Sequence, residues 1–409
     1  MPVAWVAMGL ILAIGPFGNG SLACAELREP CWQADGMTVE TMGVEYSFGQ
    51  QMTFRLAVRS EVDITSAHVF FDAGHGPLLK GTALLSRSGA ITQASYTHDL
   101  LARPLPPFSQ VTYGWEIGDA GGARLTTVSQ TLDYVDNRFA WRSIAGKGVR
   151  VAWYHEDQSL GQATLDAATE IMPRLSQDLA VPFPAQTEIY LYSRVEALQS
   201  ALATAGRPWQ GGQARPELGV VLIALDPTSD ARPLASDLAH ELTHLLVYQA
   251  TGDAYTHVPC WLDEGLAVSS EASPDPAYQA ALEAAYRDNA LISIEALCAP
   301  FPADWDTARL SYAQSQSLVR FIREQYGPQG IRTLLAAYRD GAACGSGVER
   351  ALGLPLARLE MDWQASLGPR VAWQAVFDKV GVWVMLAALL LIAPLPLVFV
   401  GRERSYRLD

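Results

Sequence analysis

The segment AHELTHLLVYQ, residues 239–249, carries the side chains with the clearest chemical potential in the chain. His240 and His244 stand four residues apart, so on an α-helix they project from one face with Cβ atoms about 6 Å apart. Two imidazole nitrogens at that spacing can bind one zinc ion at about 2 Å. Glu241, beside the first histidine, can then take a proton from water at the metal. The spacing therefore predicts a metal-binding catalytic helix.

A third ligand is expected downstream, in VPCWLDEGLAVSSEA, residues 258–272. Glu264 lies there in a second segment of helical character. Its carboxylate completes a set of two histidines and one glutamate, with a fourth position left for water. The predicted cofactor is one Zn²⁺ per chain.

The helix that carries the two histidines has recognisable start and packing signals. Ser236 or Asp237 is expected to cap it, because a short polar side chain can accept a hydrogen bond from the first free backbone N–H groups. Leu238, Leu242 and Leu245 form a stripe that would be buried against the core.

The region upstream predicts strands that precede this helical part. VRVAWYH (149–155), TEIYLYS (187–193) and GVVLIAL (219–225) read as strands, and 161–179 reads as a helix interrupted near Pro173. The strand at 219–225 suits either an edge along which an extended peptide binds or a central core position. Trp209 and the pair Gly211-Gly212 are expected to shape a cleft wall. From about residue 225 to 367 the pattern is almost wholly helical, so the predicted class is α+β.

An earlier region has a different texture. Residues 38–134 contain short β-rich runs separated by Gly, Pro and Asp turns. This pattern predicts an N-terminal β-sandwich domain over residues 26–140, immunoglobulin-like in size.

Both ends of the chain predict membrane targeting. Residues 2–17 are apolar and uncharged and are followed by SLACA, which favours a cleaved signal peptide over residues 1–25 rather than a retained anchor. Residues 380–400 carry no charge and would form a transmembrane helix about 31 Å long. Arg402, Arg404 and Arg407 in the tail 401–409 predict that this tail is cytoplasmic and the body of the protein extracytoplasmic.

Composition and cysteines narrow the class further. The formal net charge of −14, with 18% charged and 49% hydrophobic residues, argues against a nucleic-acid partner and suits a globular protein with a membrane segment. After cleavage of the signal peptide, the remaining cysteines are Cys31, Cys260, Cys298 and Cys344. In an extracytoplasmic protein these four cysteines can form two disulfides, with three possible connectivities, and free structural thiols are the alternative.

HELTH followed by WLDEGLA resembles the gluzincin zinc metallopeptidases, and in particular the bacterial peptidase MA-like family. The resemblance extends over 149–368 and implies a domain built from a mixed sheet and helices. It implies that His240, His244 and Glu264 bind zinc and that Glu241 is the general base for a zinc-activated water that hydrolyses peptide bonds. The expected partner is therefore a peptide or protein substrate.

The same resemblance suggests donors for the oxyanion of the reaction. Tyr312 is the first candidate, Tyr255 the second and His257 the third, and a packed aromatic role is the alternative for each tyrosine. Two other functions stay open at this point: a zinc hydrolase acting on a non-peptide substrate, and a binding or scaffold module without activity. The residues do not separate endopeptidase from aminopeptidase, and they do not predict an oligomeric state.

Overall fold

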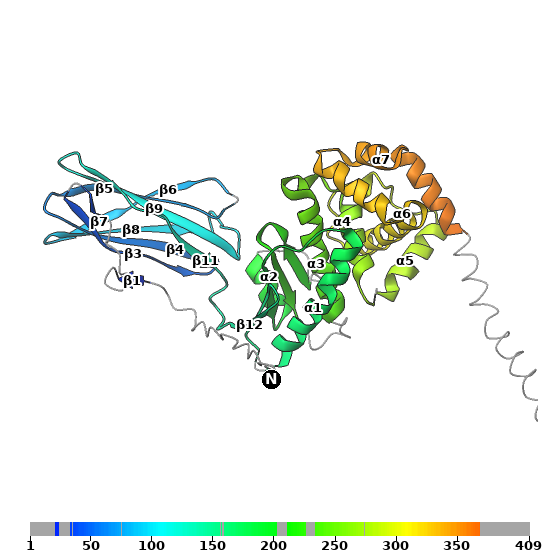
Figure 1. The fold of residues 1–409 in the computed structure, drawn as a ribbon, viewed down its shortest axis with the longest axis horizontal. Coiled ribbons are helices and arrows are strands. Elements are labelled where there is room, and N and C mark those ends of the chain that lie inside the picture. Colours follow the sequence, from blue (N-terminus) through cyan, green and yellow to red (C-terminus); the bar gives the residue numbers. More distant parts are fainter. Residues whose placement is uncertain are drawn as a thin grey trace, which may run out of the picture. The chain divides into compact units, whose positions relative to one another are not determined.

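The computed structural model describes residues 21–23, 33, 34, 36–74, 76–155, 157, 159–202, 211–225, 234–273 and 275–368. The chain divides into two compact units, Met1–Ala140 and Trp141–Asp409 (Figure 1). The predicted signal peptide (1–25) lies almost wholly outside the described residues, and the predicted transmembrane helix (380–400) and tail (401–409) lie outside them altogether. Within the described part, no helix is both long and apolar enough to span a bilayer.

The first unit consists of two antiparallel sheets, drawn in blue and cyan in Figure 1. One has the order β1–β3–β4–β8–β7, with β2 paired to β3, and the other has the order β10–β9–β5–β6, with β11 paired to β9. The strands are β1 (Ser21–Ala23), β2 (Gln33–Ala34), β3 (Met37–Ser47), β4 (Gln51–Ser60), β5 (Ile64–Asp72), β6 (Leu79–Thr82), β7 (Leu84–Ser88), β8 (Ile91–Asp99), β9 (Ser109–Asp119), β10 (Arg124–Thr126) and β11 (Gln130–Tyr134).

The two sheets share an aromatic core. Alternate residues of β4 and β9 are buried, as expected when one face of a strand is turned inward. Phe54 of β4 lies with its ring centroid 4.7 Å from that of Phe71 on β5 and 5.3 Å from that of Tyr113 on β9. The predicted β-rich first region is confirmed; its likeness to an immunoglobulin domain stays a prediction.

The second unit begins with a five-stranded mixed sheet of order β12–β13–β14–β16–β15. Its strands are β12 (Arg142–Gly146), β13 (Val149–Trp153), β14 (Thr187–Tyr192), β15 (Gly212–Arg215) and β16 (Val220–Ala224). The three central strands are parallel, and β12 and β15 run antiparallel to their neighbours. All residues of β16 are buried, so the core-strand alternative for 219–225 is the correct one, and β15 forms the edge of the sheet next to it.

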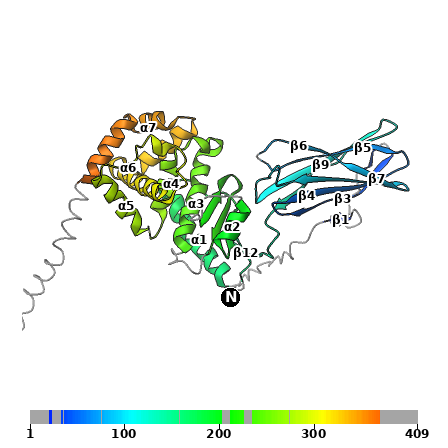
Figure 2. The same ribbon diagram turned by 180° about the vertical axis from the view of Figure 1, so that it is seen from behind.

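Helices cover both faces of this sheet (Figures 1 and 2). α1 (Ser159–Leu179) and α3 (Leu234–Thr251) pack on the face that carries Ile189, Leu191 and Val221, whereas α2 (Val195–Leu202) lies on the other. The prediction that the first helix is interrupted near Pro173 is wrong: α1 continues through this residue. A proline loses one backbone hydrogen bond, but the apolar stripe on either side, which includes Ile171 and Leu175, holds the helix against the core.

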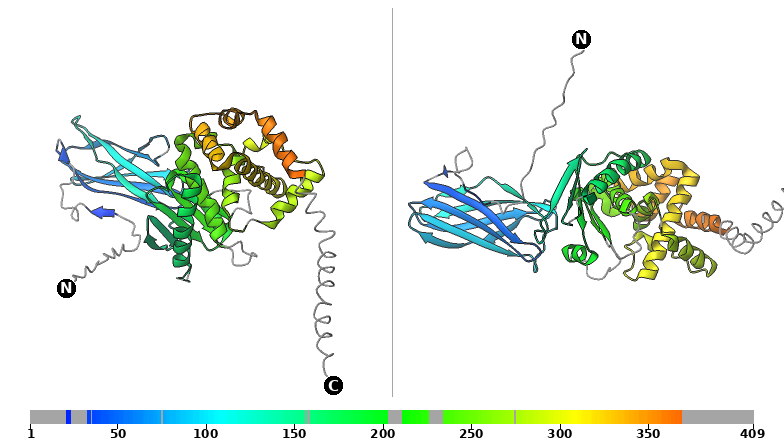
Figure 3. Two further views of the ribbon diagram at one scale, coloured as in Figure 1. Left: turned by 45° about the vertical axis from the view of Figure 1, so that its right-hand side comes forward. Right: turned by 90° about the horizontal axis from the view of Figure 1, so that it is seen from below.

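The rest of the unit is helical, which confirms the mixed α+β class (Figure 3). The elements are the 3₁₀ turn η2 (Gly252–His257), α4 (Cys260–Ser270), α5 (Pro276–Arg287), η3 (Ala296–Cys298), α6 (Trp305–Arg339), α7 (Cys344–Leu352) and a last helical segment over 356–368. α6 consists of two helices joined at Gly327, whose φ of 66° is non-helical and which precedes Pro328.

One disulfide is defined by the fold. Cys298, the last residue of η3, is bonded to Cys344, the first residue of α7. Cys260 is half-buried at the start of α4, and Cys31 lies outside the described residues. The structure therefore confirms one disulfide of the two that the sequence predicts, the bond between Cys298 and Cys344.

Candidate metal centre

The two histidines lie on one face of α3, as their spacing predicts. Their ring centroids are 5.1 Å apart. On the opposite side of the helix, Leu238, Leu242 and Leu245 are fully buried in the core. A rigid, buried helix therefore presents both imidazoles at a fixed separation.

The predicted capping of this helix is wrong, because α3 already includes Leu234 and so begins before both predicted caps. Ser236 and Asp237 lie inside the first turns of the helix. The Ser236 hydroxyl instead accepts a hydrogen bond from the backbone N–H of Ser273 at 3.1 Å, beyond the end of α4. The Ser236 side chain thus provides a hydrogen-bond acceptor for a backbone N–H group of a distant segment rather than for one of its own helix.

Glu264 reaches the histidines from α4. Its Oε2 lies 3.5 Å from Nε2 of His240 and 3.7 Å from Nε2 of His244. One ligand atom from each of the three residues lies within 4.8 Å of the others. The Glu264 Oε2 atom is buried and makes no hydrogen bond to any described residue. A buried carboxylate oxygen without a donor, facing two ring nitrogens, is suited to a cation.

Two further carboxylates hold the outer nitrogens of the imidazoles. Nδ1 of His240 donates to Oε1 of Glu271 at 2.8 Å, and Nδ1 of His244 donates to Oδ1 of Asp263 at 2.9 Å. Because the proton of each neutral ring is then on Nδ1, the lone pair of Nε2 points to the common centre. Two imidazole nitrogens and one carboxylate oxygen, oriented in this way, fit a zinc ion with an open position.

Electrostatics at the centre also favour a cation. Burial lowers the pKa of His240, but the carboxylates of Glu264 and Glu271 outweigh it and raise that pKa well above its usual range. Burial likewise lowers the pKa of His244, and Asp263 and Glu264 reverse the effect and raise it to about 9. The surrounding carboxylates therefore favour positive charge at this centre, which a bound cation would supply.

Glu241 is buried beside the histidines, with 7% of its surface exposed. Burial raises the pKa of its carboxyl, and the two histidines partly offset this effect. Strand β15 passes directly over it: a Cβ placed on Gly212 would lie 2.5 Å from Oε1 of Glu241. A side chain at this position would therefore have to displace the Glu241 carboxylate. The sequence analysis predicted that Trp209, Gly211 and Gly212 shape a cleft wall. Of these residues, Trp209 lies outside the described part of the chain.

The tyrosines predicted as oxyanion donors occupy different places. Tyr312 on α6 has its ring centroid 6.5 Å from that of His240 and is stacked on Tyr278 at 6.2 Å. Tyr255 in η2 donates its hydroxyl hydrogen to Oδ2 of Asp263 at 2.6 Å. His257 is exposed at the end of η2. Of the three, Tyr312 lies with its ring against a candidate ligand, and Tyr255 is bonded to the carboxylate behind the other histidine.

Gly265 brings the helices of the site together, a role that the sequence did not suggest. A Cβ on this residue would lie 2.5 Å from the backbone oxygen of Ser315 on α6. The glycine next to Glu264 therefore lets α4 pack closely against the helix that carries Tyr312. A small residue beside a candidate ligand is the signal that could have indicated this contact.

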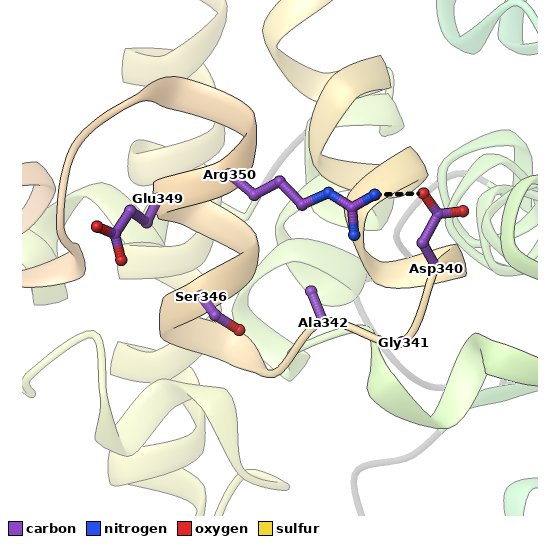
Figure 4. A pocket seen from close by; sticks show the side chains of 6 residues that line it. All are labelled: Asp340, Gly341, Ala342, Ser346, Glu349 and Arg350. Carbon is purple, nitrogen blue, oxygen red and sulfur yellow. Dashed lines mark hydrogen bonds and ion pairs between the residues drawn. The ribbon is translucent and has the colours of Figure 1, made fainter.

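A separate pocket lies between the end of α6 and α7 (Figure 4). It is lined by Asp340, Gly341, Ala342, Ser346, Glu349 and Arg350. Arg350 Nη2 donates to Oδ2 of Asp340 at 2.7 Å across it. The pocket shares no residue with the candidate metal centre.

The candidate site lies within a stretch of the chain that matches a known family model. Residues 167–368 match the family model of the Peptidase MA superfamily. This range contains both histidines, Glu264 and Tyr312. No protein of curated function matches the chain.

Several solved structures resemble parts of the fold. An M1 zinc metallopeptidase mutant from Deinococcus radiodurans is 13% identical over 78% of this chain and 91% of its own, with a TM-score of 0.37. A DUF4426 family protein from Pseudomonas aeruginosa PAO1 is 13% identical over 27% of this chain and 99% of its own, with a TM-score of 0.21. A family 56 carbohydrate-binding module that binds β-1,3-glucan is 19% identical over 24% of this chain and 99% of its own, with a TM-score of 0.17. These scores are low, so the assignment of the domain rests on the family model and the geometry of the site.

Proposed function

We propose that this chain, whose residues 167–368 form a domain of the Peptidase MA superfamily, is a zinc peptidase that hydrolyses peptide bonds at the centre between α3 and α4. The observation that carries the proposal is the convergence of His240, His244 and Glu264, whose ligand atoms lie within 4.8 Å of one another. Glu241 lies buried beside them.

The three residues would hold one zinc ion through Nε2 of each histidine and a carboxylate oxygen of Glu264. A zinc ion supplies Lewis-acid chemistry there, polarising the scissile carbonyl and lowering the pKa of water. Asp263 and Glu271 keep the imidazoles in the tautomer that leaves Nε2 unprotonated.

Glu241 acts as the general base. Its carboxylate accepts a proton as the water oxygen forms a bond to the carbonyl carbon, and it returns that proton to the amine nitrogen as the C–N bond breaks. The raised pKa of Glu241 suits both halves of this exchange, because a carboxylate that is too acidic is a weak proton acceptor. Tyr312 would donate its hydroxyl hydrogen to the carbonyl oxygen as negative charge develops there, which its position beside His240 supports.

The substrate would bind in extended form along β15. This strand is one of the two edges of the sheet, and no strand of the described part pairs with its outer side. A peptide can add to such an edge through backbone hydrogen bonds. Because Gly212 of this strand touches Glu241, a peptide on the edge would lie beside the general base.

We also propose that this chain is anchored in the membrane and that its catalytic site lies outside the cytoplasm. The uncharged stretch 380–400 and the arginines of the tail support this part of the proposal. The Cys298–Cys344 disulfide also supports it, since such bonds persist in oxidising compartments.

Replacing the base separates catalysis from metal binding. Glu241→Gln removes the proton acceptor and none of the ligands, so it should retain about one zinc per chain and lose at least about a hundredfold in kcat. Metal analysis and a peptide-library assay on the purified full chain measure both. Glu349→Gln, an exposed position in the distant pocket, is the matched control and should leave both unchanged. Cleavage by Glu241→Gln at the parent rate would overturn the mechanism.

A further inference from the structure

Tyr255 is held in a short turn between the two helices of the metal centre. The chain leaves α3 at Gly252, whose φ of 58° allows the sharp change of direction that starts η2. The carbonyl of Tyr255 then accepts a hydrogen bond from Val258 N–H at 3.0 Å, immediately before α4 begins. The ring of Tyr255 packs on that of Tyr248, with centroids 5.7 Å apart. Backbone and ring are therefore both fixed.

The hydroxyl of Tyr255 makes a short bond to one oxygen of Asp263. The distance to Oδ2 is 2.6 Å, as expected for a charge-assisted bond to a carboxylate. The other oxygen, Oδ1, accepts from Nδ1 of His244 at 2.9 Å. A continuous chain of hydrogen bonds thus runs from Tyr255 through Asp263 to His244.

This chain decides what the tyrosine can do. A phenol has one hydrogen to donate, and that of Tyr255 goes to Asp263. Donation to a substrate oxyanion would require breaking this bond.

We propose that Tyr255 is a positioning residue, which fixes the carboxylate of Asp263 and through it the orientation of His244 at the metal. The inference rests on the proposed zinc site and assigns Tyr255 a role behind the ligand rather than at the substrate.

The two histidines differ in how their carboxylates are held. Glu271, which serves His240, has a fully buried side chain, whereas 15% of the Asp263 side chain is exposed. A carboxylate nearer to water has more rotational freedom, so a second anchor matters more for Asp263. Tyr255 supplies that anchor, and without its hydroxyl the oxygen Oδ2 can turn to solvent.

The test is a double-mutant cycle on zinc affinity in the full chain, measured by competition with a chelator. Tyr255→Phe should weaken zinc binding by about tenfold and Asp263→Asn by about 10- to 100-fold, the usual range for partners of a ligating histidine. The double variant should bind zinc no more weakly than Asp263→Asn, because the tyrosine acts only through the carboxylate.

Tyr248→Phe is the matched control, since it removes a hydroxyl from the ring packed on Tyr255 without touching Asp263, and it should bind zinc like the parent. Thermal unfolding with the metal removed should be the same for Tyr255→Phe and Tyr248→Phe. If Tyr255→Phe keeps the parent zinc affinity while kcat falls, the hydroxyl acts at the substrate and the positioning role is refuted. If the parent protein itself binds no zinc, the proposed function is refuted. That outcome is distinguishable from failure of the positioning role because it does not depend on any variant.

Discussion

His240 and His244 each use one ring nitrogen for a carboxylate and keep the other for the centre. This division is set by hydrogen bonds rather than by the helix, because the i, i+4 spacing brings the rings together but does not choose their tautomers. Asp263 and Glu271 make that choice. At the scale of single residues, the proposed metal centre therefore depends on two acids in addition to its three candidate ligands.

The same acids predict a steep pH dependence of zinc binding. The pKa of His244 is raised to about 9 by Asp263 and Glu264 against the effect of burial, and that of His240 is raised as well. Both rings must lose a proton to bind metal, so affinity should rise about tenfold per pH unit for each proton displaced, throughout the range between pH 6 and 8.

Zinc competition titrations at several pH values measure this slope. Histidines with an ordinary pKa would give an affinity that levels off above about pH 7. Such a plateau would show that the carboxylates do not hold the protons as the structure indicates.

At the scale of elements, the edge strand β15 and the helix α3 meet at one glycine. A Cβ on Gly212 would press on Glu241, which is a proposed base and not a ligand. Gly212→Ala should therefore lower kcat by up to about a hundredfold through displacement of the carboxylate, and leave zinc affinity near the parent value.

The neighbouring glycine provides the control for this prediction. A Cβ on Gly211 meets nothing within 4 Å, so Gly211→Ala should keep parent activity. Steady-state kinetics and metal content of both variants test whether Gly212→Ala alone lowers kcat without loss of zinc. Equal activity of the two variants would mean that β15 does not constrain Glu241.

The disulfide joins two elements that are far apart in sequence. Cys298 and Cys344 are separated by 46 residues, and closing a loop of that size restricts the unfolded chain. Replacing both with serine should lower the free energy of unfolding by about 4 kcal/mol. Denaturant titration under non-reducing conditions measures the loss, and reduction of the parent protein should reproduce it. A difference below about 1 kcal/mol would show that the bridge adds little to the fold.

At the scale of the whole molecule, the chain combines a β-sheet unit with a unit that contains the candidate metal centre. The proposed anchor adds a third part at residues 380–400. A chain truncated after residue 368 should leave the membrane fraction and keep its zinc affinity, because every proposed ligand lies before that point. Fractionation of cells that express the full or the truncated chain tests this expectation. Release of the full chain in the absence of detergent would contradict it.

The sequence by itself predicted three candidate ligands and the order of the elements in the second unit. His240 and His244 could be placed on one face of a helix because helical periodicity is a local property. The strands of the second unit and the helical region after them were likewise predicted from local patterns. Two predictions from local patterns were wrong. α1 continues through Pro173 because its apolar residues pack against the core. α3 begins before Ser236, whose hydroxyl accepts a hydrogen bond from the backbone N–H of Ser273 instead of capping the helix.

Only the tertiary structure decided which distant residues meet. The pairing of Tyr255 with Asp263, the passage of Gly212 over Glu241 and the bond between Cys298 and Cys344 join different elements of the fold. The assignment of β15 rather than β16 to the sheet edge is of the same kind. Such contacts depend on how the core closes around many side chains at once, so no short stretch of sequence contains them.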